Sequence, residues 1–163
     1  MIVGKGDLAS ALIDRDDLLY FAMGVSNSQE TREEMYNIEK DILLSMPKTL
    51  RLVYFGSLSI FYKTGRYQQH KLQMEHLVRS NFPDYCIVRL GNITWGNNPN
   101  TIINYLRNRY KEDKPLVIED TTRYLIDVKE FQHWLGLIPD WNCELNITGQ
   151  PMTVQQIVDK YIK

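Results

Sequence analysis

The chain has 163 residues, of which 44% are hydrophobic and 24% are charged, and its formal net charge is −1. This composition is typical of one globular domain with a real core, and it disfavours nucleic acid or an anionic membrane surface as a partner. No apolar stretch reaches the roughly 18 residues of a membrane span and no signal peptide is recognisable, so a cytoplasmic location is expected. Cys86 and Cys143 lack metal-ligand spacing and are expected to be buried free thiols, and no metal site is predicted.

Apolar runs and helical patterns alternate along the chain, which predicts an α/β domain with a parallel sheet. Strands are expected at residues 1–3, 18–23, 52–55, 85–90, 116–118 and 144–147, and helices at 7–13, 31–46, 66–78, 101–110, 129–135 and 153–162. The helix at 31–46 has Glu33 and Glu34 in its first turn and Pro47 just after its end, as helix termini favour.

Tyr67 and Lys71 form the pattern with the most functional content, together with Ser57 at the end of a buried strand. Positions i and i+4 lie on one helical face, so both side chains can point at the same site. A nearby ammonium favours the phenolate form of a tyrosine, and a serine hydroxyl could hold a substrate oxygen beside it. The set suits proton transfer to or from a carbinol or carbonyl oxygen. Ser59 is a rival for the serine role, whereas His70 and His76 are expected at the surface or in an interface.

This set resembles the catalytic triplet of the short-chain dehydrogenase/reductase superfamily, and other segments match in the same order. Residues 4–9 fit a Gly-x-Gly-x-x-Ala turn, in which glycines permit the close approach of a pyrophosphate. Residues 21–28 resemble the small-residue turn that lies along the cofactor. Residues 89–96 resemble the Arg-Leu-x-Asn-Val-Tyr-Gly segment of the extended branch, which borders the nicotinamide and brings its asparagine to the substrate diphosphate. Residues 123–128 resemble the segment whose arginine grips the phosphates of a nucleotide sugar, although Tyr124 replaces the usual aspartate.

The resemblance identifies the chain as an unusually short member of the extended, NAD-dependent epimerase/dehydratase branch. It implies a single minimal Rossmann-like domain at 1–163, with helices on both faces of a mostly parallel sheet and a small substrate-side region at 92–163. It implies NAD or NADP as cofactor and a nucleotide sugar as substrate. The implied catalytic residues are Ser57, Tyr67 and Lys71, the implied cofactor-binding residues are Gly4, Gly6, Ala9, Gly24, Val25, Lys71 and Leu90, and the implied substrate-binding residues are Ser59, Asn92 and Arg123.

The region after the first strand departs from the family pattern. Only about fourteen residues lie between the first strand and the strand at 18–23, so the usual second and third strands cannot fit. The acidic residue that binds the adenosine ribose has no clear counterpart, since Asp14, Asp16 and Asp17 are more consistent with a solvated turn. The shortened connection leaves four possibilities open. The first helix changes faces, the crossover has an unusual hand, residues 1–3 barely form a strand, or a second subunit completes the edge of the sheet.

Three functions are compatible with this sequence. The first is an NAD(P)-dependent epimerase, dehydratase or reductase of a nucleotide sugar. The second is a reduced relative that binds a nucleotide or a protein partner without turnover, and the third is a reductase of a small carbonyl compound. The resemblance also implies a homodimer through the helices at 31–46 and 66–80, where apolar surface comes from Met35, Ile38, Ile42, Leu43, Leu72, Met74, Leu77 and Val78.

Overall fold

A parallel sheet of five strands forms the centre of the computed structural model, which describes residues 1–163. The strand order is β1 (Ile2–Val3), β2 (Leu18–Phe21), β3 (Arg51–Ser57), β4 (Tyr85–Leu90) and β7 (Cys143–Ile147). Every residue of β2 and the first five of β3 are buried, as expected for parallel strands that are covered on both faces. The predicted α/β fold is confirmed, and β1 pairs directly with β2 as the edge of a sheet without the usual second and third strands.

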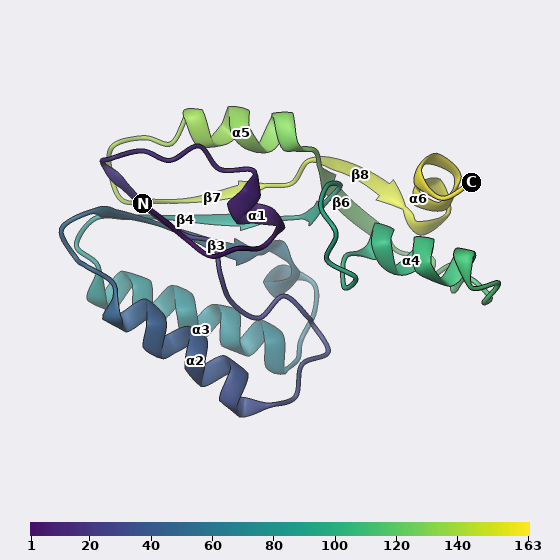
Figure 1. Ribbon diagram of the computed structural model, residues 1–163, viewed down its shortest axis with the longest axis horizontal. Coiled ribbons are helices and arrows are strands. Elements are labelled where there is room, and N and C mark those ends of the chain that lie inside the picture. The colour runs from purple at the N-terminus through teal and green to yellow at the C-terminus, as the bar shows by residue number, and fades with distance from the viewer.

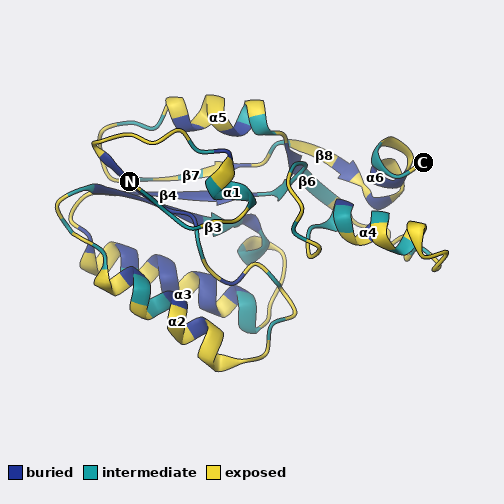
Figure 2. Ribbon diagram, viewed as in Figure 1, coloured by how far each residue is buried: buried dark blue, intermediate teal, exposed yellow.

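Helices cover both faces of this sheet (Figure 1). α2 (Glu33–Ser45) and α3 (Arg66–Asn81) lie below it in the view of Figure 1, and α1 (Asp7–Ser10) and α5 (Val128–Gly136) lie above it. The lower core packs Leu43 and Met74 against Tyr54 of the sheet, and the upper core packs Phe131 against Phe55. Figure 2 shows the resulting pattern, in which the strands and the inner helix faces are buried and the outer helix faces are exposed. None of the helices has the length and apolar character that a membrane span requires.

The connection through α1 has the unusual hand. β1, β2, β3 and β4 lie side by side in chain order and are parallel. A connecting helix on one face of the sheet therefore gives the opposite crossover hand to a helix on the other face. The crossovers through α2 and α3 have the right hand that nearly all such connections share, and the one through α1 therefore has the left hand. Of the possibilities that the shortened connection left open, the structure shows the unusual crossover, with a first strand of only two residues.

A small lobe lies beyond the carboxyl end of β4 (Figure 1). It consists of a sheet of β5 (Asn92–Ile93), β6 (Thr122–Ile126) and β8 (Gln150–Thr153), with α4 (Ile102–Lys111) and α6 (Val154–Tyr161) packed on it. Leu106, Leu125 and Ile157 fill its separate apolar core. Between β6 and β8 the chain returns to the main sheet through α5 and β7, so residues 92–163 contribute to both parts.

Two predicted elements are wrong in extent or place. The strand expected at 116–118 does not form, because Val117 and Ile118 are exposed, and β6 at Thr122–Ile126 takes its place in the sheet. The first helix ends at Ser10 and leaves Ile13 exposed, instead of continuing to residue 13. The sequence patterns also missed β5, β8 and the short 3-10 helix η1 (Leu58–Phe61). Cys86 and Cys143 are free thiols on adjacent strands, with their Sγ atoms 3.3 Å apart; Cys86 is buried and Cys143 half-buried.

Candidate active site

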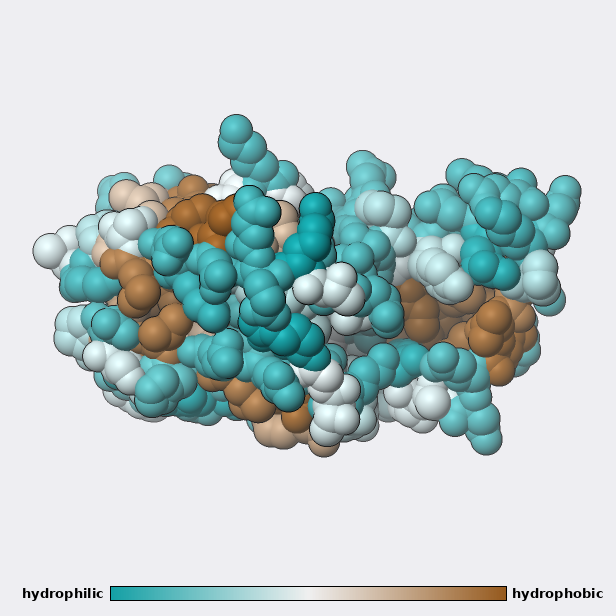
Figure 3. Space-filling model, turned by 90° about the horizontal axis from the view of Figure 1, so that it is seen from below, coloured by the Kyte–Doolittle hydropathy of each residue, from teal (hydrophilic) through white to brown (hydrophobic).

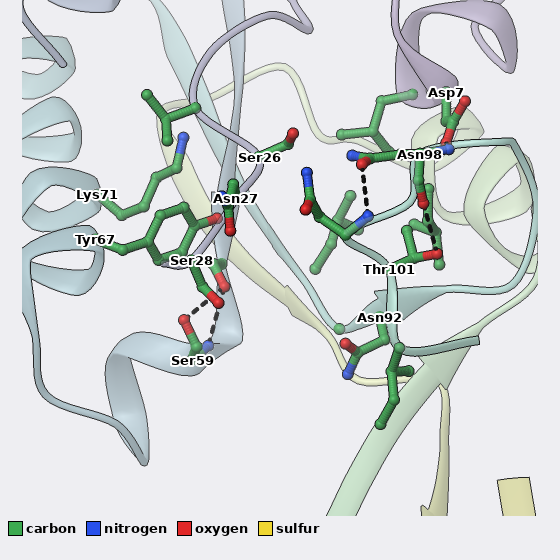
Figure 4. Close-up of a pocket in the computed structure, with 18 of the residues that line it drawn as sticks. Asp7, Ser26, Asn27, Ser28, Ser59, Tyr67, Lys71, Asn92, Asn98 and Thr101 are labelled. Atoms are coloured by element: carbon green, nitrogen blue, oxygen red, sulfur yellow. Dashed lines mark hydrogen bonds between the residues drawn. The ribbon is translucent and has the colours of Figure 1, made fainter. Parts of the chain in front are cut away.

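A cavity of about 1220 Å³ opens at the carboxyl ends of the parallel strands, between the main sheet and the small lobe. Small-molecule pockets typically measure roughly 300–1,000 Å³, so this cavity has room for a large ligand. Figure 4 shows polar side chains on both sides of the cavity. One wall carries Ser59, Tyr67 and Lys71, the opposite side carries Asp7, Asn92, Asn98 and Thr101, and the loop with Ser26, Asn27 and Ser28 lies between them.

The predicted catalytic residues Ser57, Tyr67 and Lys71 all line this cavity. Ser57 is the last residue of β3, and Tyr67 and Lys71 lie in the first turns of α3. The Lys71 Nζ atom lies 5.6 Å from the centre of the Tyr67 ring, as the spacing of four residues on one helical face predicts. The structure therefore brings a hydroxyl, a phenol and an ammonium together at one edge of the sheet.

Ser57 and Ser59 share a hydrogen bond. Their Oγ atoms lie 2.9 Å apart, either hydroxyl can be the donor, and Gln68 donates to the Ser59 Oγ atom over 3.1 Å. The Ser57 Oγ atom also accepts from the Ser59 backbone N–H over 3.2 Å. When Ser59 is the donor, these two bonds use both lone pairs of the Ser57 oxygen, and the Ser57 proton is available to a ligand.

A buried carboxylate lies behind Lys71. Glu39 of α2 is 1% exposed and Lys71 is 5% exposed, and the Lys71 Nζ atom donates to the Glu39 Oε1 atom over 3.0 Å. The Glu39 Oε2 atom accepts from the Val25 backbone N–H over 2.8 Å. Sequence patterns missed Glu39, although it shares a helical face with the buried side chains of Tyr36 and Leu43.

His70 is a second member of this network, and the prediction that it lies at the surface is wrong. Its side chain is fully buried, and its Nε2 atom lies 2.9 Å from the Glu39 Oε2 atom. The Nδ1 atom is buried and has no hydrogen-bond partner. Tyr36 covers the imidazole, with the two ring centres 4.6 Å apart.

The charges in this network shift the pKa values of both partners. Burial opposes the ionised form of Glu39, but the charge of Lys71 and the hydrogen bond from His70 lower its pKa from 4.5 to about 2. Burial also opposes the Lys71 ammonium, yet the neighbouring Tyr54 hydroxyl and Glu39 carboxylate leave the Lys71 pKa raised. Because the folded state keeps Glu39 ionised, the pair stabilises the fold above pH 4.5, and this contribution is lost as the pH falls towards 2.

The predicted cofactor-binding residues divide into two groups. Gly6, Gly24, Val25 and Leu90 line the cavity with Lys71, whereas Gly4 and Ala9 do not. A Cβ atom on Gly4 would lie 2.3 Å from the Ala22 carbonyl oxygen, so this glycine permits the close contact of β1 with β2.

Gly24 is required by its surroundings. Its φ is +137°, and a Cβ atom there would lie 2.3 Å from the Glu39 carboxyl carbon. Gly24 therefore lets the turn after β2 rest on Glu39 while it borders the cavity.

The first turn of α1 is tied to the small lobe by Asp7, which the sequence analysis did not single out. Its carboxylate accepts the backbone N–H groups of Asn97 and Asn98 over 3.1 and 2.9 Å. Trp95 donates its indole N–H to the Asp7 carbonyl oxygen over 2.9 Å. Asp7 thus holds the segment after β5 against the mouth of the cavity.

The predicted substrate-binding residues Ser59, Asn92 and Arg123 also line the cavity. Arg123 donates to Glu119 over 2.6 Å, and the Asn92 side chain donates to the Tyr124 carbonyl oxygen over 3.3 Å. Both side chains are therefore oriented by contacts within the lobe.

The carboxylates at 14, 16 and 17 lie away from the cavity and are exposed, as a solvated turn requires. Asp14 pairs with the N-terminal amino group and Asp17 with Arg15, each over 2.6 Å.

No protein-family model and no curated protein matches the chain. Among solved structures, the chain resembles the Bordetella bronchiseptica enzyme WbmG in complex with NAD (TM-score 0.66, 15% identity). It also resembles UDP-glucuronic acid 4-epimerase from Bacillus cereus (TM-score 0.69, 18% identity) and dTDP-glucose 4,6-dehydratase from Bacillus anthracis (TM-score 0.65, 15% identity). Each match covers 88% of this chain but only 55%, 57% and 56% of the respective solved chains. The predicted resemblance to the extended epimerase/dehydratase branch is thus confirmed at the level of the fold, and the chain spans little more than half the length of these solved chains.

Proposed function

We propose that this protein binds a nicotinamide dinucleotide at the carboxyl edge of its sheet and uses Ser57, Tyr67 and Lys71 to process a nucleotide sugar. The observation that carries the proposal is the meeting of these three side chains with Val25 and Leu90 in one cavity. The solved relatives support it, since WbmG is described with NAD and the Bacillus cereus epimerase with NAD and a UDP-sugar derivative.

In this proposal Tyr67 takes a proton from a substrate hydroxyl or returns one to a carbonyl oxygen. The Ser57 hydroxyl donates to that same oxygen and fixes its position beside the phenol. The Lys71 ammonium lies beside the Tyr67 ring. Lys71 has three N–H donors and gives one to Glu39, so two others can hold a ribose hydroxyl.

The cavity fits the nicotinamide half of a dinucleotide better than the adenine half. Val25, Leu90 and Lys71 would hold the nicotinamide and its ribose, and Gly6 leaves open space at the start of α1, because a Cβ atom there would meet nothing within 4 Å. The cofactor would supply hydride transfer. No carboxylate reaches the region beyond β1 where an adenosine ribose would lie, since the acidic residues at 14–17 belong to the exposed turn before β2. Dinucleotide affinity should therefore come mainly from the nicotinamide side.

The small lobe would hold the substrate. Asn92 and Arg123 face the cavity from this side, and a guanidinium suits the phosphates of a nucleotide sugar. In this proposal the Arg123–Glu119 ion pair breaks when the diphosphate binds, and Arg123 contacts the phosphates instead. The residues at 92–163 outside α5 and β7 thus form the proposed substrate-side region.

A second candidate function is nucleotide-sugar binding without turnover. Two observations favour it: α1 has only four residues, and Asp7 places a carboxylate at its first turn, where a pyrophosphate would approach. A small carbonyl compound would be the substrate if the lobe proves too small for a nucleotide sugar.

Calorimetric titrations with NAD, NADH, NADP and NADPH, and separately with UDP-glucose, distinguish these functions. We expect equimolar binding of at least one dinucleotide and of the UDP-sugar. If no dinucleotide binds at millimolar concentration, the enzymatic proposals are wrong. Binding of UDP-glucose alone would then support the second candidate.

We further propose that the protein is a homodimer through the outer faces of α2 and α3. Met35, Ile38 and Leu72 are between 36% and 48% exposed there, whereas Leu43, Met74 and Val78 are fully buried in the monomer core and cannot form the interface. Figure 3, seen from the side of α2 and α3, shows separate apolar patches among hydrophilic atoms. A dimer is expected in light scattering at micromolar concentration, and a monomer would refute it.

A further inference from the structure

Lys71 is paired with an anion before any ligand arrives. The Glu39 carboxylate touches the Lys71 ammonium over 3.0 Å, and both groups are almost completely shielded from water. Charges interact much more strongly in such a setting than at a surface. A lysine whose charge is offset by a carboxylate attracts a neighbouring phenolate less than a lysine without such a partner.

We propose that Glu39 is a positioning residue that fixes Lys71 and sets the charge felt by Tyr67. The carboxylate holds the lysine beside the tyrosine and at the same time offsets much of the ammonium charge. The inference rests on the proposed role of Tyr67. It predicts that the Tyr67 phenolate forms at a higher pH than it would beside a lysine without this partner.

Four contacts fix Glu39 in this position. One oxygen accepts from Lys71 and from the Tyr54 hydroxyl, and the other accepts from the Val25 backbone N–H over 2.8 Å and contacts His70 over 2.9 Å. The side chain also lies directly under Gly24, whose φ of +137° and lack of a Cβ atom make room for the carboxyl group. Glu39 therefore joins the turn that borders the proposed cofactor side to the helix that carries Tyr67 and Lys71.

No other ionisable group around Lys71 and Tyr67 takes the place of the Glu39 carboxylate. His70 contacts the second oxygen of Glu39, and the loop after β2 presents no ionisable side chain to the cavity. Burial raises the pKa of the phenol of Tyr54 on β3, so Tyr54 stays neutral beside Lys71. Tyr36 on α2 and Tyr62 after η1 also lie near this cluster, and Arg66 stacks on Tyr36. The charged side chains of Lys5, Asp7, Lys63, Glu119 and Arg123 line other parts of the cavity.

The test is the ionisation of Tyr67 in the whole protein without cofactor or substrate. Tyrosine labelled with ¹³C at Cζ reports ionisation by NMR, and the Tyr67→Phe variant identifies the Tyr67 resonance. We expect the Glu39→Gln variant, which removes the charge but keeps an oxygen acceptor for Val25, to lower the Tyr67 titration midpoint by about one pH unit or more. An unchanged midpoint would overturn the proposal.

Glu75→Gln is the matched control. Glu75 is also a fully buried carboxylate on α3, but it pairs with Arg89 and Arg79 and not with Lys71. Its substitution should leave the Tyr67 midpoint unchanged, and an equal shift in both variants would show that the effect is not specific to Glu39. If Glu39→Gln does not fold, the ¹³C resonance of the Glu39 carboxyl in the unmodified protein decides. A midpoint well below 4.5 supports the ion pair, and a midpoint at 4.5 overturns it.

This measurement needs neither dinucleotide binding nor turnover. If no dinucleotide binds in the calorimetric titrations, the proposed function is wrong, but the Tyr67 midpoint is unaffected. If Glu39→Gln leaves the Tyr67 midpoint unchanged, the proposed cofactor binding still stands.

Discussion

Replacing Tyr67 by phenylalanine is expected to lower turnover of a nucleotide sugar by about 10²–10⁴-fold while dinucleotide affinity changes only a few-fold. The substitution removes the hydroxyl that would exchange a proton with the substrate but keeps the ring that lies 5.6 Å from the Lys71 Nζ atom. Single-turnover kinetics would give the rate of the chemical step, and calorimetry would give the affinity.

Tyr105→Phe is the matched control for this experiment. Tyr105 lines the same cavity from α4 and is 46% exposed, so loss of its hydroxyl should change turnover only a few-fold. If Tyr67→Phe retains the unmodified rate, Tyr67 has no part in the proton transfer. If both variants lose activity to the same extent, a general effect on the cavity would explain the result better.

Substituting Arg89 by methionine is expected to destabilise the fold by about 3–5 kcal/mol, because it leaves a buried carboxylate without its main partner. The Arg89 Nε and Nη2 atoms each donate to one oxygen of Glu75 over 2.7 Å, and Glu75 is fully buried. Arg89 also donates to Asn146 over 3.2 Å and pairs with Glu144, so it ties α3 and β4 to β7. Equilibrium unfolding in urea measures the change.

Arg79→Met provides the comparison, since Arg79 donates to the same two carboxylates. Its side chain is 36% exposed, and a pair of this kind contributes about 0–1 kcal/mol. The double variant Arg89→Met with Glu75→Leu should regain much of the lost stability, because it removes both buried charges together. If Arg79→Met and Arg89→Met lower the free energy of unfolding equally, burial does not explain the contribution of Arg89.

The sequence predicted those features that depend on local patterns. Continuous apolar runs located β2, β3 and β4, and the spacing of four residues placed Tyr67 and Lys71 on one face of α3. The rule that parallel strands present their carboxyl ends at one edge explains why Ser57, Val25 and Leu90 meet there.

The features that were missed depend on contacts between distant segments. Glu39 and His70 looked like ordinary polar residues of helices, and only the packing of α2 against α3 buries them together. Asp7 contacts Asn98 across 91 positions, which no local pattern reveals. The hand of the α1 crossover was likewise undetermined, because a four-residue helix can connect two adjacent strands over either face.

The central claim is that a nicotinamide dinucleotide occupies the cavity at the carboxyl edge of the sheet. Backbone amide NMR spectra recorded during a titration with NAD or NADP locate the bound ligand most directly. We predict that the shifted resonances gather on Gly6, Val25, Ser57 and Leu90, while those of the exposed turn at residues 14–17 stay in place. Unchanged spectra at millimolar dinucleotide, or shifts confined to residues outside the cavity, would contradict this account.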